Sequence, residues 1–249
     1  MSGPETLLAI FAHPDDESFR CGGTLALLAR RGVRVWVLCA TRGEAGVPGL
    51  SPEQAGQVRE RELRCACRAL GIEPPRFLDY QDGTLAQVDE GQAVERVVRA
   101  VRELRPQVLL TWPPDGLSGH PDHVAVSRWT GEAFRRLGLS SPLAKRRRTE
   151  TKASPLSLYH IVVPRSLAQA LGVTHLHTVP DEVVTLAVDV SAVWEAKMAA
   201  IRCHRTQMGG SPILSASEER RRLFLGMEHF RLEVVRPDSL AGLSKDFFN

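Results

Sequence analysis

Residues 6–17 have the sequence TLLAIFAHPDDE, an apolar run that passes directly into polar side chains. The apolar part is short, unbroken and free of proline, which is typical of a strand buried on both faces of a sheet. His13 and Asp16 lie three residues apart in the turn that follows, so an imidazole nitrogen and a carboxylate oxygen can converge on one cation. Asp15 lies between them and points elsewhere. The end of this strand is therefore expected to carry part of a metal site.

A second group of metal-ligating side chains follows another apolar run, QVLLTW at 107–112. After a loop rich in proline and glycine the chain continues with HPDH at 120–123, and His123 is the best candidate for a third ligand. On its own, the first turn fits an ordinary connection in which an aspartate caps a helix equally well. The distant His-x-x-His motif favours the metal site, because two strand ends can then meet at one ion.

The order of the predicted elements indicates an α/β protein. A helix at 25–31, ending before Gly32, is followed by a strand at 33–40, which is the spacing of a right-handed βαβ unit with parallel strands. We expect a Rossmann-like, three-layer fold with a mainly parallel sheet and a metal site at the carboxyl ends of the strands. The first strand is not followed by G-x-G-x-x-G, so nucleotide binding is not expected. Further strands are predicted at 76–80, 107–112, 156–163, 185–190 and 230–235, and further helices at 52–70, 90–104, 124–137, 193–204 and 218–228.

The length of 249 residues and an apolar content of 43% are sufficient for one large domain with a sizeable core. We expect a single domain over 1–249, with the catalytic motifs in 1–137 and with the sheet and the substrate pocket completed by 156–249. Helical and strand patterns are lost between these parts, so 138–155 is expected to be a mobile surface loop. Its basic run at 145–148 is expected to be solvated rather than to bind phosphate or nucleic acid, because no aromatic residues interleave with it.

Composition limits the partners and the compartment. The formal net charge of +3 is small for this length, so charge does not indicate a nucleic-acid or membrane partner. No apolar stretch approaches the roughly 18 to 20 residues of a membrane span, and the N-terminus lacks a basic region and a cleavage site. The 5 cysteines are odd in number and form no C-x-x-C pair, which favours free thiols in a reducing cytoplasm. We therefore expect a cytoplasmic protein without stable membrane insertion.

Several of these motifs together resemble the PIG-L/LmbE family. They are AHPDDE at 12–17, CGGTLA at 21–26, TRGEAG at 41–46, the helix that carries Arg59, DG at 82–83 and GHPDH at 119–123. The resemblance covers residues 6–135, and beyond them it rests chiefly on Lys197, His204 and Gln207. It implies a zinc-dependent deacetylase acting on a small molecule that contains N-acetylglucosamine, such as a mycothiol- or bacillithiol-type thiol precursor. Members of the family often form symmetric assemblies, which leaves a homo-oligomer open.

The resemblance and the chemistry of amide hydrolysis together give each site residue a role. His13, Asp16 and His123 would hold Zn2+ and leave one position open for water, although two imidazoles and a carboxylate also suit Fe2+. Asp15 would take the proton of the attacking water and pass it to the leaving amine, which matches the family role of that carboxylate. His120 would stabilise the oxyanion that develops on the carbonyl oxygen.

Four further residues are expected to contact the substrate. The resemblance implies that Arg59 contacts the sugar or its phosphate, whereas an arginine on a helix face often pairs with a neighbouring carboxylate. Asp82 can hold two sugar hydroxyls at the end of a strand, or it can merely form a turn. His204 and Gln207 are implied by the weaker resemblance in the C-terminal third. Asp122, by contrast, is expected to orient a histidine or to cap a helix.

Two other functions stay open at this point. One is a metal-dependent hydrolase of another amide or ester, with the same catalytic centre but without the sugar contacts of Asp82 and Arg59. The other is a non-catalytic metal-binding protein on the same fold, which the presence of both Asp15 and His120 disfavours. A serine hydrolase is disfavoured more strongly, because residues 116–120 lack the G-x-S-x-G spacing.

Overall fold

Strand β1 (Thr6–Phe11) lies inside a seven-stranded sheet, and all of its residues are buried. The other strands are β2 (Arg34–Cys39), β3 (Arg76–Phe77), β4 (Val108–Thr111), β5 (Ser157–Ile161), β6 (Leu186–Asp189) and β7 (Met227–Glu233). In the computed structural model, which describes residues 4–140, 156–210, 213–233 and 246–248, the strand order is β3-β2-β1-β4-β5-β7-β6. Neighbours from β3 to β5 are parallel, whereas β7 runs antiparallel to β5 and β6. The expected α/β fold with a mainly parallel sheet is confirmed.

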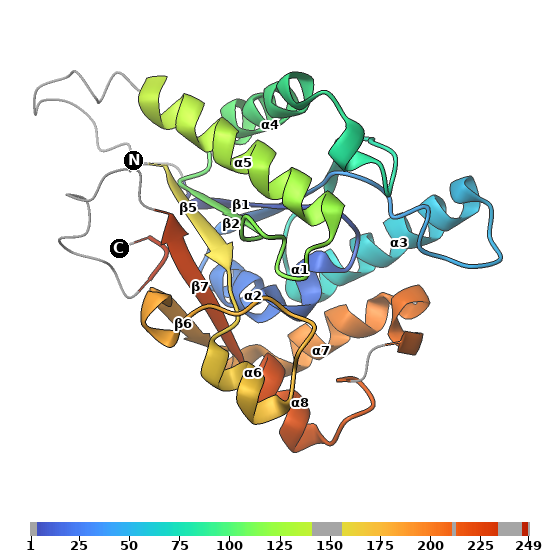
Figure 1. Cartoon of the computed structure of the whole chain (residues 1–249), viewed down its shortest axis with the longest axis vertical. Coiled ribbons are helices and arrows are strands. Elements are labelled where there is room, and N and C mark those ends of the chain that lie inside the picture. Colours follow the sequence, from blue (N-terminus) through green and yellow to red (C-terminus); the bar gives the residue numbers. More distant parts are fainter. Residues whose placement is uncertain (1–3, 141–155, 211–212, 234–245, 249) are drawn as a thin grey trace, which may run out of the picture.

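Helices cover both faces of this sheet (Figure 1). They are α1 (Asp16–Phe19), α2 (Gly22–Arg30), α3 (Pro52–Leu70), α4 (Glu90–Leu104), α5 (Pro121–Ser140), α6 (Arg165–Leu171), α7 (Trp194–Cys203) and α8 (Glu218–Leu225). Leu8 and Ile10 of β1 pack against α4 and α5, whereas Leu7 and Phe11 share a core with α2 and α3 on the opposite face. α7 packs on α2 and α3 and thickens that layer. Among the described helices, none combines the length and the apolar character that crossing a bilayer requires.

Local sequence explains where α3 begins and ends. The Ser51 side chain accepts a hydrogen bond from the backbone N–H of Gln54, and the Gln54 side chain accepts one from the backbone N–H of Ser51. Pro52 occupies the first turn, where its missing N–H is not needed. Gly71 ends the helix with a φ of 71°, a left-handed conformation that glycine adopts without strain. This helix carries Arg59 to the site.

The structure departs from the predicted elements in several places. The short helices α1 and α6 were not expected, because segments of this length carry too few residues to show a helical repeat. β3 is limited to residues 76–77. α5 continues to residue 140, so the first residues of the loop expected at 138–155 are helical. The rest of that segment, including the basic run at 145–148, lies outside the described residues.

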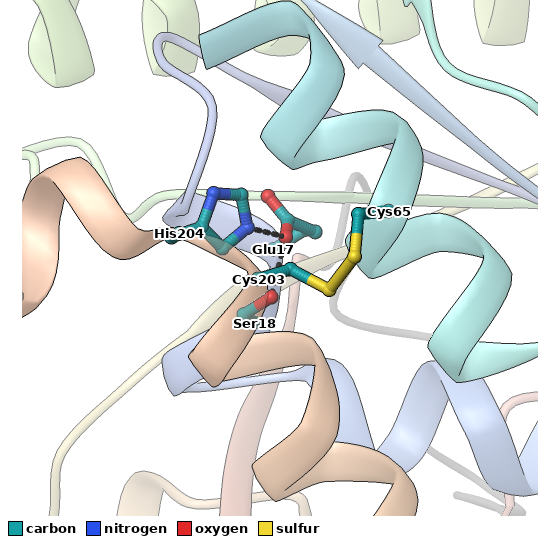
Figure 2. Close-up of a disulfide and its surroundings, with 5 residues drawn as sticks. All are labelled: Glu17, Ser18, Cys65, Cys203 and His204. Carbon is teal, nitrogen blue, oxygen red and sulfur yellow. Dashed lines mark hydrogen bonds and ion pairs between the residues drawn. A yellow bond between two sulfur atoms is a disulfide. The ribbon is translucent and has the colours of Figure 1, made fainter. Parts of the chain in front are cut away.

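A disulfide joins Cys65 in α3 to Cys203 at the end of α7 (Figure 2). This bridge corrects the expectation of free thiols, and it removes the support that cysteine usage gave to a reducing compartment. Cys21, Cys39 and Cys67 are free and buried, as expected for small apolar side chains. The bonded pair is separated by 138 residues, so no local spacing pattern indicated it. The bridge fastens the C-terminal helix layer to the half of the chain that carries the motifs.

Reduction of this disulfide should lower the free energy of unfolding by about 2–4 kcal/mol, because the bridge restricts the unfolded chain. Urea unfolding of the wild type with and without dithiothreitol measures the difference. The Cys203→Ala variant is the control, since it should be insensitive to the reductant. Equal stability of the oxidised and the reduced wild type would contradict this prediction.

Candidate metal centre and active site

The motifs AHPDDE and HPDH meet at the carboxyl ends of β1 and β4, which are neighbouring strands. From these two ends the chain continues to opposite faces of the sheet. After β1 it continues to α2 on one face, and after the neighbouring strand β4 it continues to α5 on the other. Such a divergence opens a crevice at the carboxyl ends of the two strands. The turn after β1 contributes His13 and Asp16, and the connection from β4 into α5 contributes His120 and His123. Residues more than a hundred positions apart therefore face one another.

Three of these side chains direct ligand atoms at a common point. One ligand atom from each of His13, Asp16 and His123 lies within 4.8 Å of the other two. Nε2 of His123 is 3.3 Å from Oδ1 of Asp16, and Nδ1 of His13 is 3.9 Å from Oδ2 of Asp16. The side chains are between 7% and 14% exposed, so they are shielded from bulk water but not sealed off. The residues named as ligands from the sequence thus converge in the structure.

Three hydrogen-bond donors fix the carboxylate of Asp16 through its Oδ2 atom. Its Oδ2 accepts from the backbone N–H groups of Ala12 and His13, both at 3.0 Å, and from Nε1 of Trp112 at 3.2 Å. Burial raises the pKa of this carboxyl, but the neighbouring His123 and His13 lower the pKa by a larger amount. The net effect holds the pKa of Asp16 well below its usual range. Asp16 is therefore ionised at neutral pH, and its Oδ1 remains directed at His123.

Each of the two candidate ligand histidines, His13 and His123, is oriented by a contact at its other ring nitrogen. Nε2 of His13 lies 3.2 Å from Oδ2 of Asp122 and 3.0 Å from Oδ1 of Asp82. Nδ1 of His123 lies 3.2 Å from the carbonyl oxygen of Gly116. Protons on these two nitrogens leave Nδ1 of His13 and Nε2 of His123 to face the common point. Burial lowers the pKa of His13, but Asp122 and Asp82 raise it to about 10, so a metal must displace a proton there.

The donor set fits a divalent transition metal. Two imidazole nitrogens and one carboxylate are ligand types of catalytic zinc sites, and every one of them has a partner that fixes its direction. A second group, His13, His120 and Asp122, also has ligand atoms within 4.8 Å of one another. In that group both carboxylate oxygens of Asp122 accept backbone N–H groups, those of Gly83 and Leu85, and Nδ1 of His120 accepts the N–H of Asp122. The first group is the better metal site because its facing atoms are less engaged.

Asp15 lies beside the candidate ligands without belonging to their group. Its φ of 112° is rare for a residue with a side chain, and its backbone N–H donates to Oε2 of Glu17 at 3.0 Å. The side chain is 23% exposed, and its Oδ1 lies 3.4 Å from Nη2 of Arg59. Desolvation and the adjacent Asp16 raise the pKa of Asp15 to about 7, although Arg59 and His204 lower it. A carboxyl with this pKa can take up and return a proton near neutral pH.

Arg59 reaches the site from α3 and is only 4% exposed. Its guanidinium donates to the carbonyl oxygen of Pro14 at 2.6 Å and to that of Gly43 at 2.9 Å, in addition to facing Asp15. A side chain at position 43 would overlap this guanidinium, which explains the glycine in the second loop, residues 41–46 after β2. Arg59 therefore braces the turn that carries Asp15. Its contact with a sugar stays a prediction.

His120 and Asp82 lie around the ligand group. The His120 ring is exposed, with its centroid 4.9 Å from that of His13 and 4.8 Å from that of His123. Desolvation and the charges of His13 and His123 lower the pKa of His120. Asp82 accepts a hydrogen bond from the backbone N–H of Ala45 at 3.0 Å and is largely buried against His13. The contact of Asp82 with substrate stays a prediction.

His204 and Gln207 contact the segments that carry the site residues, and neither belongs to the candidate ligand group. His204 is fully buried, and its Nε2 lies 2.7 Å from Oε1 of Glu17 (Figure 2). The second oxygen of Glu17 accepts the backbone N–H of Asp15. Gln207 donates to the carbonyl oxygen of Gly46 at 3.0 Å. Both side chains therefore support the turn and the second loop, and their contact with substrate stays a prediction.

Trp112 is the site residue that the sequence analysis missed. Its ring stacks on His123 with centroids 4.7 Å apart and planes 7° from parallel, while its Nε1 donates to Asp16. It therefore touches two of the three candidate ligands. The sequence contains one signal for this role, because Trp112 is the last apolar residue before the loop that carries HPDH.

Comparisons with known proteins agree with this geometry. The model of the PIG-L family, described as GlcNAc-PI de-N-acetylase, matches residues 8–134. A relative from Acidothermus cellulolyticus, named 1D-myo-inositol 2-acetamido-2-deoxy-alpha-D-glucopyranoside deacetylase, is 35% identical, and the aligned region covers 91% of this chain and 88% of the relative. The match therefore extends over nearly the whole length of both chains.

Solved structures share the fold at lower identity. N,N'-diacetylchitobiose deacetylase from Pyrococcus horikoshii superposes with a TM-score of 0.69 at 21% identity, covering 94% of this chain and 87% of that one. The zinc-inhibited form of teicoplanin deacetylase Orf2 gives a TM-score of 0.63 at 19% identity, covering 94% and 99%. With more than half of its length matched by the family model, this chain belongs to the PIG-L family of de-N-acetylases.

Proposed function

We propose that this protein is a zinc-dependent N-deacetylase that hydrolyses the acetamido group of N-acetylglucosamine linked to inositol, giving acetate and a free amine. The observation that carries the proposal is the convergence of His13, Asp16 and His123 beside Asp15, a carboxyl that stays outside the ligand group. The name of the relative from Acidothermus cellulolyticus supports the choice of substrate. The donor set supports a divalent transition metal, and the zinc-inhibited form of teicoplanin deacetylase supports the binding of zinc on this fold. Fe2+ would also suit these ligands.

The reaction needs a nucleophile, a base and a partner for the developing oxyanion. A divalent metal at this site would lower the pKa of a coordinated water and polarise the carbonyl group. Asp15 accepts the proton of the attacking water and returns it to the nitrogen as the C–N bond breaks. Arg59 and Glu17 keep this carboxyl in place, one at the side chain and one at the backbone.

His120 serves as the hydrogen-bond donor to the oxyanion. Its Nδ1 accepts the backbone N–H of Asp122 at 3.2 Å, so the neutral ring carries its proton on Nε2. A neutral imidazole is therefore already a donor, and the lowered pKa of His120 does not prevent this role. The sugar is assigned to the side of Asp82 and the second loop, where carboxylate and backbone groups can bind hydroxyls.

Asp15→Asn should keep stoichiometric zinc but lower kcat by about a hundredfold or more, because an amide cannot take the proton. Asp16→Asn should lose zinc, since it removes the charged ligand. Metal analysis by mass spectrometry and an assay of acetate release separate the two effects. Asp181→Asn, an exposed carboxylate away from the site, is the control. An Asp15→Asn variant with wild-type turnover would overturn the assignment of the base.

Zinc-loaded protein should release acetate from inositol-linked N-acetylglucosamine with a higher kcat/KM than from free N-acetylglucosamine or from a non-sugar acetamide. Asp82→Ala should lower kcat/KM for the sugar substrates about tenfold more than for the non-sugar acetamide, because it removes hydrogen bonds to the sugar. An equal loss of kcat/KM on all substrates would show that Asp82 does not bind the sugar. Release from none of them at full zinc occupancy would favour another amide substrate or a non-catalytic role.

A further inference from the structure

The disulfide between Cys65 and Cys203 adjoins the residues that support Asp15 (Figure 2). Cys203 is the last residue of α7, and His204 follows it directly. The bridge joins this position to α3, the helix whose Arg59 contacts the side chain of Asp15. A covalent bond between two helices therefore lies next to the contacts of the proposed base, although neither cysteine has a role in the reaction described above.

Of the two ring nitrogens of His204, only Nε2 has a hydrogen-bond partner among the described residues. Nε2 lies 2.7 Å from Oε1 of Glu17, whereas Nδ1 is buried without a partner. Both side chains are almost completely buried, and the other oxygen of Glu17 accepts the backbone N–H of Asp15 at 3.0 Å. The contact between His204 and Glu17 therefore depends on where the backbone places residue 204.

Asp15 needs this support because its backbone is strained. Its φ of 112° is a conformation that residues with a side chain rarely adopt, and such a conformation persists only where the surrounding structure imposes it. The hydrogen bond from its N–H to Glu17 is one of the contacts that impose it. If Glu17 moves, the turn can relax and carry the carboxylate of Asp15 away from the candidate ligands.

Two attachments hold the segment after α7 to α3. One is the disulfide, and the other is Thr206, whose backbone N–H and hydroxyl donate to the carboxylate of Glu62 at 2.9 and 2.7 Å. Glu62 and Cys65 are three residues apart, so both attachments are on one face of α3. His204 lies between them in the chain. Two thiol sulfurs in van der Waals contact are farther apart than two bonded ones, so reduction moves residue 203 relative to α3.

The bridge is accessible to thiols in solution. Both of its cysteines are partly exposed, whereas the three free cysteines are buried. Arginines lie close to both in the chain, because Arg64 and Arg202 precede them and Arg68 follows Cys65 by three residues. Positive charge stabilises thiolates, which are the attacking and the leaving groups of disulfide exchange. The position of the bridge therefore favours its reaction with a small-molecule thiol.

We propose that the bridge between Cys65 and Cys203 is a redox switch for the proposed deacetylase. The intact bridge keeps His204 and Glu17 in contact with the turn of Asp15, and reduction by a small-molecule thiol weakens this contact and lowers kcat. In the reaction the S–S bond breaks, two molecules of the thiol are oxidised to their own disulfide, and their two protons pass to the cysteine sulfurs. This inference rests on the proposed function and adds regulation to the same site.

Kinetics of the oxidised and the reduced enzyme test the proposal, with reduced glutathione as the thiol and inositol-linked N-acetylglucosamine as the substrate. Reduction of the zinc-loaded wild type should lower kcat about tenfold, because a misplaced catalytic group is costly, and should leave KM and the zinc content unchanged. Reoxidation should restore kcat. Cys203→Ser should have the low kcat in both conditions. Cys67→Ala, which changes a buried free thiol of the same helix, is the matched control and should keep the whole response.

NMR chemical shifts give a readout that depends neither on turnover nor on the free energy of unfolding, because they report the geometry of the folded state. The amide proton of Asp15 should move upfield on reduction, since its hydrogen bond to the carboxylate of Glu17 weakens. The backbone N–H of Leu85 donates to the carboxylate of Asp122 at 3.0 Å and is the matched control. Its signal should keep its position.

Each other result has a defined meaning, provided that alkylation and mass spectrometry show the bridge to be open. Equal kcat of the oxidised and the reduced wild type would overturn the inference and leave the proposed function intact. A loss confined to KM, or one that follows a loss of zinc, would also overturn it, as would an unmoved amide signal of Asp15. An oxidised, zinc-loaded enzyme that releases no acetate would refute the proposed function instead, and the amide signal would still test the link from the bridge to Asp15.

Discussion

The carboxylate of Asp16 connects the two strand ends on which the site is built. Its Oδ2 accepts two backbone N–H groups from its own turn after β1 and the indole N–H of Trp112 from the end of β4. Hydrogen bonds to an ionised and buried acceptor are strong, and removal of the acceptor would leave three buried donors unpaired. The same contacts fix the direction of Oδ1 before any metal binds. The geometry of the candidate metal centre therefore follows from the sheet itself.

Buried ion pairs fasten the C-terminal third to this centre. His204 pairs with Glu17 behind Asp15, and Lys197 of α7 pairs with Glu228 at 2.7 Å, all of them fully buried. Glu228 also accepts N–H groups at the start of α2, where a helix favours negative charge. Breaking a buried pair leaves an uncompensated charge, which is far more costly than losing a surface pair. The position of Asp15 thus depends on residues close to two hundred positions away in the chain.

The sequence predicted those parts of the protein whose signals are local. β1 ends in polar residues, and His13, Asp16 and His123 lie at strand ends that the apolar pattern reveals, so their convergence followed from the parallel sheet. The disulfide was not predictable, because Cys65 and Cys203 meet only when α7 packs on α3. The apolar cavity beside His123 was not predictable for the same reason, since its walls come from segments that have no pattern in common. The environment of His204 likewise appears only once the chain is folded.

Diffraction at the zinc absorption edge from crystals of the zinc-loaded protein tests the central claim most directly. We predict one anomalous peak from a zinc ion that is bound by Nδ1 of His13, Nε2 of His123 and Oδ1 of Asp16, at about 2.0–2.2 Å from each atom. Asp15 should lie beside this ion without binding it. A zinc ion held instead by His120 and Asp122, or a fully loaded protein with no zinc in this crevice, would contradict the account.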